Sequence, residues 1–267
     1  NTRFLSSNGT ALTLLETARW TNAPGLGPNS AGSMPDWSRN GRFAVYARIQ
    51  GLAIPLFGQP GHNGPGDLVR TDWSGTAFGA PTVLVRATGS QNNYYPGIAP
   101  DDTWVIFNRS AMTSYNAIDA HLWAVRADNP ASAVRLAAAD GAGDLGNSWP
   151  KWAAFVQSYQ GEPLLWFTFS SRRDYGLRLQ QQSRAAEMRT VQLWMAAFRP
   201  NRAGTGDPSA PAFWLPFQDV ASGNHIAQWS EQVQRQGCRA DTDCRAGERC
   251  VMGGVTSMSG TLSCVMQ

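Results

Sequence analysis

The chain has 267 residues, of which 15% are charged and 10% aromatic, and its formal net charge is +3. This aromatic-rich composition excludes a disordered chain. Lys151 is the only lysine and the arginines form no basic run, which argues against a nucleic-acid partner.

The first residues of the chain do not show a signal-like pattern. Asn1 to Phe4 contain no initiator methionine and no charged-then-apolar leader. No stretch approaches the ~20 consecutive apolar residues of a membrane-spanning helix. We therefore expect a mature, trimmed or partial chain without a membrane span.

Short apolar runs follow one another along the first 230 residues, separated by Gly, Pro, Asn and Asp. They favour β-branched and aromatic residues, so they predict strands rather than helices. Residues 179–188 are the exception, and are either a helix or a polar excursion between two strands. The clearest strand predictions cover 43–47, 82–85, 104–107, 122–125, 164–169 and 191–196.

The order within these runs repeats. One unit opens with the turn Trp37-Ser38-Arg39-Asn40-Gly41, and a second with Ile98-Ala99-Pro100-Asp101-Asp102. Asn40-Gly41 predicts a two-residue hairpin turn, and Pro100 presets the corresponding corner. A third opening follows Trp149, and a partial fourth begins at Asn224.

Two further strands follow each complete opening, giving four strands per unit. The units cover about 33–88, 94–139 and 148–217, with partial strands at 1–20 and 224–235. Repeated units of four antiparallel strands are the blades of a β-propeller. We predict that the blades occupy residues 1–235.

The first opening resembles the blade turns of TolB-like propellers and of the related WD-type repeats, in which the first strand ends in Trp-Ser-Pro-Asp-Gly. Arg39 replaces the proline of that pattern, Asp102 replaces the glycine in the second unit, and the third unit has lost the motif. The resemblance covers residues 30–230 and implies an all-β propeller. Such rings commonly close with roughly six to eight blades, so it also implies a partial ring. If the two ends of this chain join, four blades result.

All four cysteines lie in the last 30 residues, which are polar. We predict a disulfide-stapled appendix over residues 236–267, in an oxidising compartment. The alternative is zinc, but zinc ligands usually pair two to four residues apart, and the gaps here are five, five and thirteen. Three disulfide pairings are open, and no Cys-x-x-Cys-His haem motif occurs. The residues are Cys238, Cys244, Cys250 and Cys264.

The sequence contains no evident catalytic constellation. No Gly-x-Ser-x-Gly elbow accompanies the three histidines, and we interpret His121 and His225 as structural. The aspartates at 101, 102, 119, 140 and 144 lie beside turn residues and are interpreted as turn formers. We expect no cofactor and no metal site; enzymatic activity stays open, and the sequence favours its absence.

Polar and aromatic residues immediately precede two of the blade openings, which places them at one mouth of the central channel of a propeller. They predict a contact surface for a peptide or a carbohydrate. His62, in a Gly-rich loop, is a further candidate. The predicted binding residues are Asn92, Asn93, Tyr94, Tyr95, Trp149 and His62.

Two functions follow as expectations. The first is a non-catalytic bacterial propeller, periplasmic or extracellular, that binds or scaffolds proteins as a subunit of a larger assembly; its partner includes, as one option, the rest of the same propeller. The second is a propeller glycosidase or a carbohydrate-binding lectin with its site at the channel mouth.

Overall fold

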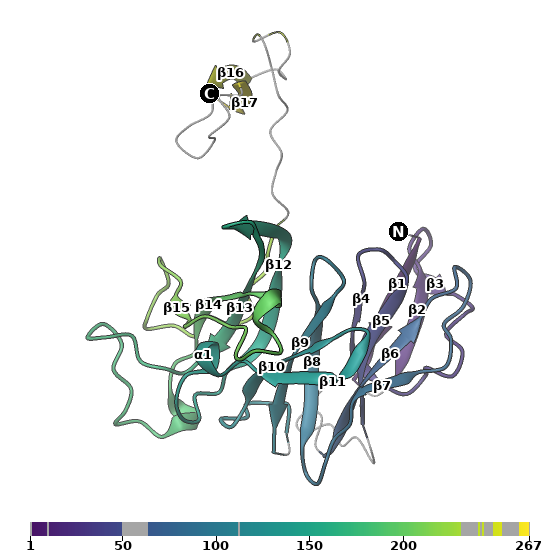
Figure 1. The fold of residues 1–267 in the computed structure, drawn as a ribbon, viewed down its shortest axis with the longest axis horizontal. Coiled ribbons are helices and arrows are strands. Elements are labelled where there is room, and N and C mark those ends of the chain that lie inside the picture. The colour runs from purple at the N-terminus through teal and green to yellow at the C-terminus, as the bar shows by residue number, and fades with distance from the viewer. Residues whose placement is uncertain are drawn as a thin grey trace. The chain divides into compact units, whose positions relative to one another are not determined.

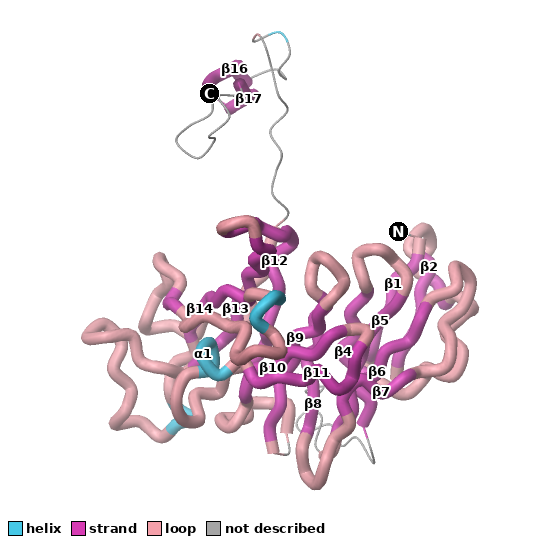
Figure 2. Tube along the Cα trace, in the orientation of Figure 1, coloured by secondary structure: helices cyan, strands magenta, loops and turns pink. Residues whose placement is uncertain are grey.

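A computed structural model describes residues 2–9, 11–49, 64–111, 113–230, 240, 242, 248–252 and 262–266. Strands dominate these residues, and Figure 2 shows how little helix accompanies them. The helical pieces are α1 (Ala137–Asp140), η1 (Ala186–Met188) and η2 (Pro200–Arg202). The chain divides into two compact units, Asn1–Trp229 and Ser230–Gln267.

The first unit is a row of antiparallel sheets in chain order (Figure 1). It begins with a three-stranded sheet of β1 (Arg3–Ser7), β2 (Leu12–Glu16) and β3 (Thr21–Asn22). The first four-stranded blade then contains β4 (Ser33–Trp37), β5 (Phe43–Ile49), β6 (Gly66–Asp72) and β7 (Thr82–Val85).

Two more blades follow. The second contains β8 (Asn92–Ile98), β9 (Trp104–Ser110), β10 (His121–Arg126) and β11 (Asn129–Arg135). The third contains β12 (Ser148–Tyr159), β13 (Glu162–Ser171), β14 (Gln192–Phe198) and β15 (Phe213–Trp214). In each blade every strand pairs antiparallel with the next, so the predicted all-β fold of four-stranded antiparallel blades is confirmed.

Strand registers place the three blades in correspondence. Trp37 pairs with Ala44, Ile98 with Val105, and Trp152 with Phe167. We call β4, β8 and β12 the inner strands, because each opens its blade and β8 contacts both β4 and β12. A position in one blade therefore has a defined equivalent in the other two.

The core lies between neighbouring sheets. One hydrophobic cluster joins the N-terminal sheet to the first blade, a second joins the first blade to the second, and a third joins the second to the third. Val105, Ile106 and Phe167 are fully buried in these clusters. Each such side chain contributes about 1.5–3 kcal/mol through burial, so the stability of the row resides in its sheet-to-sheet contacts.

The turn at Asn40-Gly41 forms as a hairpin, but not as a two-residue turn. Only Gly41 has positive φ (71°), and its N–H donates to Ser38 O over 3.0 Å. Asp102 holds the equivalent place in the second blade, with φ 61° and an N–H that donates to Ala99 O. In both loops a left-handed residue donates its N–H to the carbonyl three residues before it, and β4 ends at Trp37, earlier than the dipeptide alone predicts.

A true two-residue turn joins β12 to β13, and it yields a stability prediction. Gln160 (φ 54°) and Gly161 (φ 80°) both lie in the left-handed region, between the paired residues Tyr159 and Glu162. Asn suits the first position of such a turn better than Gln, so Gln160→Asn is expected to raise the free energy of unfolding by about 0.5 kcal/mol. Urea unfolding measures it. Gln160→Val should have the opposite sign, and equal effects would contradict the assignment.

A polar residue lies at or next to the start of the third strand in every blade; it is buried in the first and third blades and half-buried in the second. Asp67, His121 and Gln192 occupy equivalent positions, opposite Arg48, Arg109 and Ser171. Each anchors the segment that follows the fourth strand: Asp67 accepts from Ala87 N (2.8 Å), and Gln192 donates to Ser222 O (2.9 Å).

In the second blade this anchor becomes a network around Asp140, which is fully buried. Its carboxylate lies 2.8 Å from His121 Nδ1 and 2.7 Å from an Arg135 guanidinium nitrogen, and it accepts from Leu122 N and from Asn147 Nδ2. Burial opposes ionisation, but His121, with the hydrogen bonds from Asn147 and Arg135, lowers the pKa of Asp140. The predicted turn former is therefore also the centre of a charged cluster.

The second unit contains one described hairpin, β16 (Glu248–Met252) and β17 (Leu262–Met266). Cys250 lies directly opposite Cys264 in its register. Cys238 and Cys244 lie outside the described residues, so the disulfide framework stays a prediction. In the part of the chain that the structure describes, no helix is long and apolar enough to cross a membrane.

Candidate functional site

Each blade opening places a non-glycine residue in the left-handed region. These residues are Met34 (φ 53°), Tyr95 (φ 49°) and Trp149 (φ 54°), and each precedes a proline. Ile226 (φ 57°) repeats the feature in the partial fourth opening. Such a conformation costs of order 1–3 kcal/mol and persists only where the surrounding fold imposes it. Its recurrence at equivalent positions marks this edge of the blades as a candidate site.

The register of each inner strand shifts at the same place. The irregularities fall between Ser33 and Asp36, between Tyr94 and Gly97, and between Ser148 and Lys151. A bulge re-aims the side chain that it carries. Here the three left-handed side chains converge on one cavity of about 350 Å³, lined by β1, β4, β8 and β12.

Aromatic rings form one wall of this cavity. The Tyr95 and Trp149 rings stack with their centroids 3.8 Å apart, and Tyr94 meets Tyr95 edge-on at 5.0 Å. The His225 ring meets the Trp149 indole edge-on, with centroids 5.7 Å apart. Tyr95 N–H also contacts the Met34 sulfur at 3.4 Å. The rings of two blades and the Met34 thioether of the first blade thus form a preformed apolar surface at the mouth.

Two opposite charges accompany that wall. Asp36 and Lys151 both line the cavity and occupy equivalent positions on β4 and β12, opposite Val45 and Thr168. Asp36 Oδ2 accepts from Ile98 N over 2.6 Å. Burial raises the pKa of Asp36, although Ile98 N–H and Lys151 oppose the shift. A carboxyl group in a cavity whose pKa is raised by burial is typical of a functional site.

The raised pKa of Asp36 gives a pH-dependent prediction. A carboxyl whose folded pKa exceeds its unfolded pKa contributes most stability below its unfolded value, and that contribution is lost as the pH rises through the folded pKa. Asp36→Asn keeps an acceptor for Ile98 N–H without the charge. As the pH rises from about 4 to 7, the difference in the free energy of unfolding between variant and parent should therefore shift in favour of the variant. Urea unfolding at several pH values measures this difference. A difference independent of pH would contradict this account.

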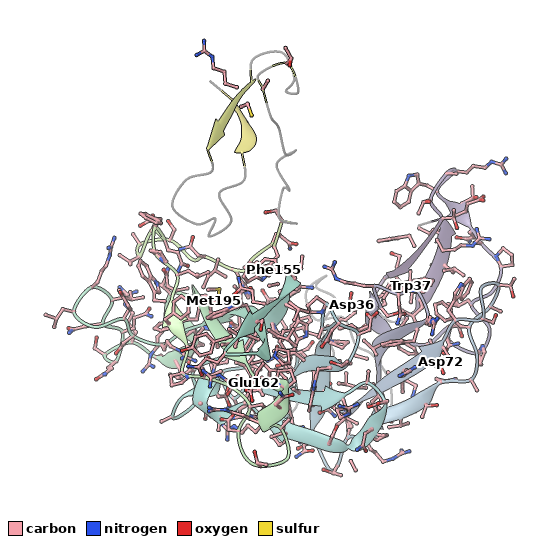
Figure 3. All side chains as sticks on the ribbon, turned by 45° about the horizontal axis from the view of Figure 1, so that its top comes forward. Asp36, Trp37, Asp72, Phe155, Glu162 and Met195 are labelled. Carbon is pink, nitrogen blue, oxygen red and sulfur yellow. The ribbon has the colours of Figure 1, made fainter. Side chains whose placement is uncertain are left out.

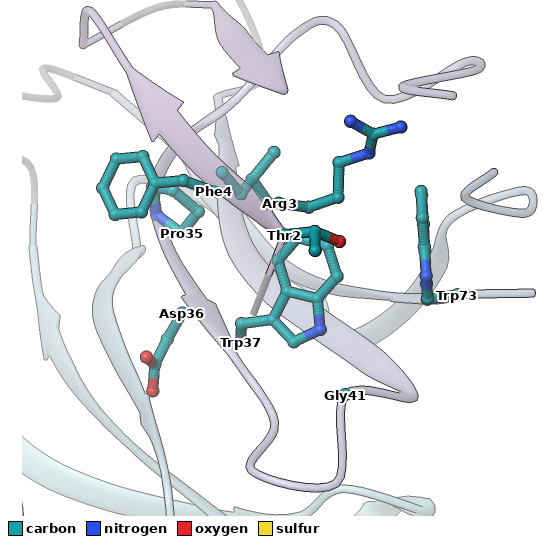
Figure 4. A pocket seen from close by; sticks show the side chains of 9 residues that line it. Thr2, Arg3, Phe4, Pro35, Asp36, Trp37, Gly41 and Trp73 are labelled. Atoms are coloured by element: carbon teal, nitrogen blue, oxygen red, sulfur yellow. The ribbon is translucent and has the colours of Figure 1, made fainter. Parts of the chain in front are cut away.

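A second cavity of about 300 Å³ continues along β1 beside the first, and Asp36 lines both. Figure 4 shows its lining, with Trp37 turned toward Trp73 and Asp36 pointing away from it. Figure 3 labels the same Asp36 and Trp37 among the side chains of the first unit. The side chains of these two neighbouring residues of β4 thus point in different directions, as expected for successive residues of a strand.

The predicted binding residues are distributed unevenly. Tyr95 and Trp149 line the cavity, while Tyr94 is buried behind them. Asn92 and Asn93 are fully buried, and Asn93 donates to Gly66 O and accepts from Arg109, both within the blades. His62 lies outside the described residues. Sequence reasoning missed Met34, Asp36 and Lys151, although the shared Met34-Pro35, Tyr95-Pro96 and Trp149-Pro150 pattern was a usable signal.

The cavity offers several kinds of group for contact with a ligand. Its described lining combines aromatic, thioether, hydroxyl and single charged groups, and it includes one carboxyl, that of Asp36. Among the described residues, no group of three or more His, Cys, Asp or Glu side chains is placed to hold a metal ion. The site is suited to holding an extended or planar ligand group between the rings and the charges.

No protein-family model and no curated protein matches the chain. Solved structures similar to it include TolB from Acinetobacter baumannii, at 14% identity and TM-score 0.39, covering 75% of this chain and 38% of that one. Hydrazine synthase from Kuenenia stuttgartiensis has 11% identity and TM-score 0.43, covering 83% and 52%. A putative TolB from Agrobacterium tumefaciens has 14% identity and TM-score 0.33, covering 80% and 76%. The chain thus spans about two fifths and half of the first two proteins.

Proposed function

We propose that this chain is a non-catalytic protein-binding propeller module, acting in the bacterial envelope or outside the cell as a subunit of a larger assembly. The observation that carries the proposal is the channel mouth, where left-handed residues of three blades converge on one cavity. Its partner segment is held by the Tyr95–Trp149 stack and oriented by Asp36 and Lys151.

Physical chemistry supports a protein ligand at this mouth. Buried aromatic side chains with a few fixed polar groups are the usual centres of protein interfaces. The rings are already stacked in the unbound chain, so binding loses little side-chain entropy. Asp36 and Lys151 lie on different inner strands and select a segment with complementary charges at that spacing.

Affinity purification of the full-length protein from its own cells, followed by native mass measurement, tests the proposal. We expect a protein partner at fixed stoichiometry, and loss of that partner from a Tyr95→Ala/Trp149→Ala variant that still unfolds cooperatively. Hydrolysis of a substrate by the purified protein alone would overturn the proposal.

One observation favours a second candidate, a carbohydrate ligand. The Tyr95 and Trp149 rings offer an aromatic wall in a cavity that also contains serine hydroxyls. A glycosidase uses a pair of carboxyl groups, and the described lining contains only Asp36. The candidate is therefore a lectin, and glycan binding by the isolated protein, lost in Trp149→Ala, would establish it.

A further inference from the structure

The inner edge of β1 is open. Among the described residues β1 pairs only with β2, whereas β5, β9 and β13 each pair with an inner strand as well. Ser7 Oγ donates to Gly32 O, which lies two residues before Met34. In the same way, Asn108 on β9 donates to Asn147 O, which lies two residues before the equivalent residue Trp149. β1 therefore corresponds to the second strand of a blade.

The segment Asn224–Trp229 has the complementary character of an inner strand without a second strand. Ile226 N donates to Ser170 Oγ, just as Trp149 N donates to Asn108 Oδ1 in the preceding blade. Trp229 Nε1 donates to Thr168 Oγ1 and fixes the segment against β13. Within the described chain, no strand pairs with Asn224–Trp229.

The two ends of the row also expose side chains that are buried elsewhere. Phe4 is 47% exposed, whereas its equivalents on the second strands of the three blades are 0% exposed: Ala44, Val105 and Phe167. At the other end Trp166 is partly exposed, whereas its equivalents Phe43 and Trp104 are 4% and 3% exposed. Each end face therefore lacks the neighbouring blade that covers it in the middle of the row.

The cavities connect these ends. Every residue from Thr2 to Ser7 lines at least one of the two cavities. Alternate side chains of a strand point to opposite faces of its sheet, so one face alone would contribute only every second residue. The unbroken lining therefore means that the edge of β1 faces the cavities. Trp149 and Lys151 also line the larger cavity. They in turn contact the segment, through the His225 ring and through Trp229 Nε1, which donates to Lys151 O over 3.2 Å.

We propose that Asn224–Trp229 pairs with the open edge of β1 in the same chain and closes a ring of four blades. The blade registers fix the pairing: Ser7 opposite His225, Leu5 opposite Gln228, and Phe4 opposite Trp229, as Asn108 pairs with Tyr94, Ile106 with Gly97, and Val105 with Ile98. Closure buries Phe4 and Trp166 and brings Ile226 to the mouth beside Met34, Tyr95 and Trp149. It does not depend on which ligand the mouth binds.

Paired cysteines test the register, since residues 1–237 contain none. Under mild oxidation, Ser7→Cys/His225→Cys and Leu5→Cys/Gln228→Cys should each form a link within one chain, identified by mass after proteolysis. The matched control Ser6→Cys/Gln228→Cys places the thiols on opposite faces and should lose the link. Links between two chains, no link in the in-register pairs, or equal linking in the control would each overturn the proposal.

Hydrogen exchange of the unmodified protein gives an independent reading if a cysteine variant fails to fold. A closed ring protects the backbone amides along β1 as strongly as those of β5 and β9. An open edge leaves alternate β1 amides exchanging like those of a sheet edge. That result would overturn the closure.

Discussion

Asp140→Ala is expected to lower the free energy of unfolding by about 3–5 kcal/mol, because it removes the centre of a buried charged network. The variant leaves Leu122 N–H without its side-chain acceptor and removes one of the two Asp140 acceptors of the Asn147 amide. It also takes the buried counter-charge away from the His121 and Arg135 side chains. Arg173 lies beside this network and donates to Asp140 O, with burial lowering its pKa to about 10. Its charge then lies in the same cluster without the carboxylate that offsets it.

Urea unfolding at pH 7 measures the loss, and Asp144→Ala is the matched control. Asp144 is mostly exposed and lies 3.6 Å from His121 Nε2, so its removal should change stability by no more than about 0.5 kcal/mol. Because the folded pKa of Asp140 is lowered, the difference between Asp140→Ala and the parent should shrink as the pH falls through that pKa. Equal losses in the two variants would show that Asp140 is only a turn residue.

Trp149→Ala is expected to weaken binding of the protein partner by at least about 30-fold, the effect of removing a central aromatic anchor worth about 2 kcal/mol. The indole stacks on Tyr95, contacts His225 and lines the cavity at the same time. Its removal therefore takes away contact area and also frees the Tyr95 ring that it holds. Calorimetry or surface-based binding with the purified partner measures the change.

Phe217→Ala is the control for this effect. Phe217 is also aromatic, is 100% exposed, and does not line the cavity, so its loss should leave affinity unchanged. The unfolding midpoint of Trp149→Ala separates lost contact from lost structure. Unchanged affinity in a folded Trp149→Ala variant would remove the channel mouth as the binding site.

The blades were predictable from the sequence because their signals are local. Runs such as 43–47 and 104–107 combine β-branched and aromatic residues with flanking turn residues, and they lie within β5 and β9. The proximity of Tyr95 and Trp149 was predictable for the same reason, because both residues stand at a blade opening and the propeller topology brings successive openings together; their role in binding stays a prediction.

The features that could not be predicted from the sequence depend on contacts between residues far apart in the chain. Asp140 has the local sequence of a turn former, and its network with His121 and Arg135 exists only once β10 and β11 are paired. Asp36 on β4 meets Ile98 N–H of the next blade, 62 residues away. Asn92 and Asn93 show the converse error of local reasoning, since their polarity indicated a surface while the packing of β6 against β8 buries them.

The left-handed backbone at Met34, Tyr95 and Trp149 allows ligand selectivity to change during evolution while the fold is kept. The conformation is common to all three, while the side chains are a thioether, a phenol and an indole. A substitution at one of these positions can therefore replace one recognition group with another while the blade beneath keeps its shape. Related chains could diverge in what they recognise through three single-codon changes, without any insertion, deletion or rearrangement of strands.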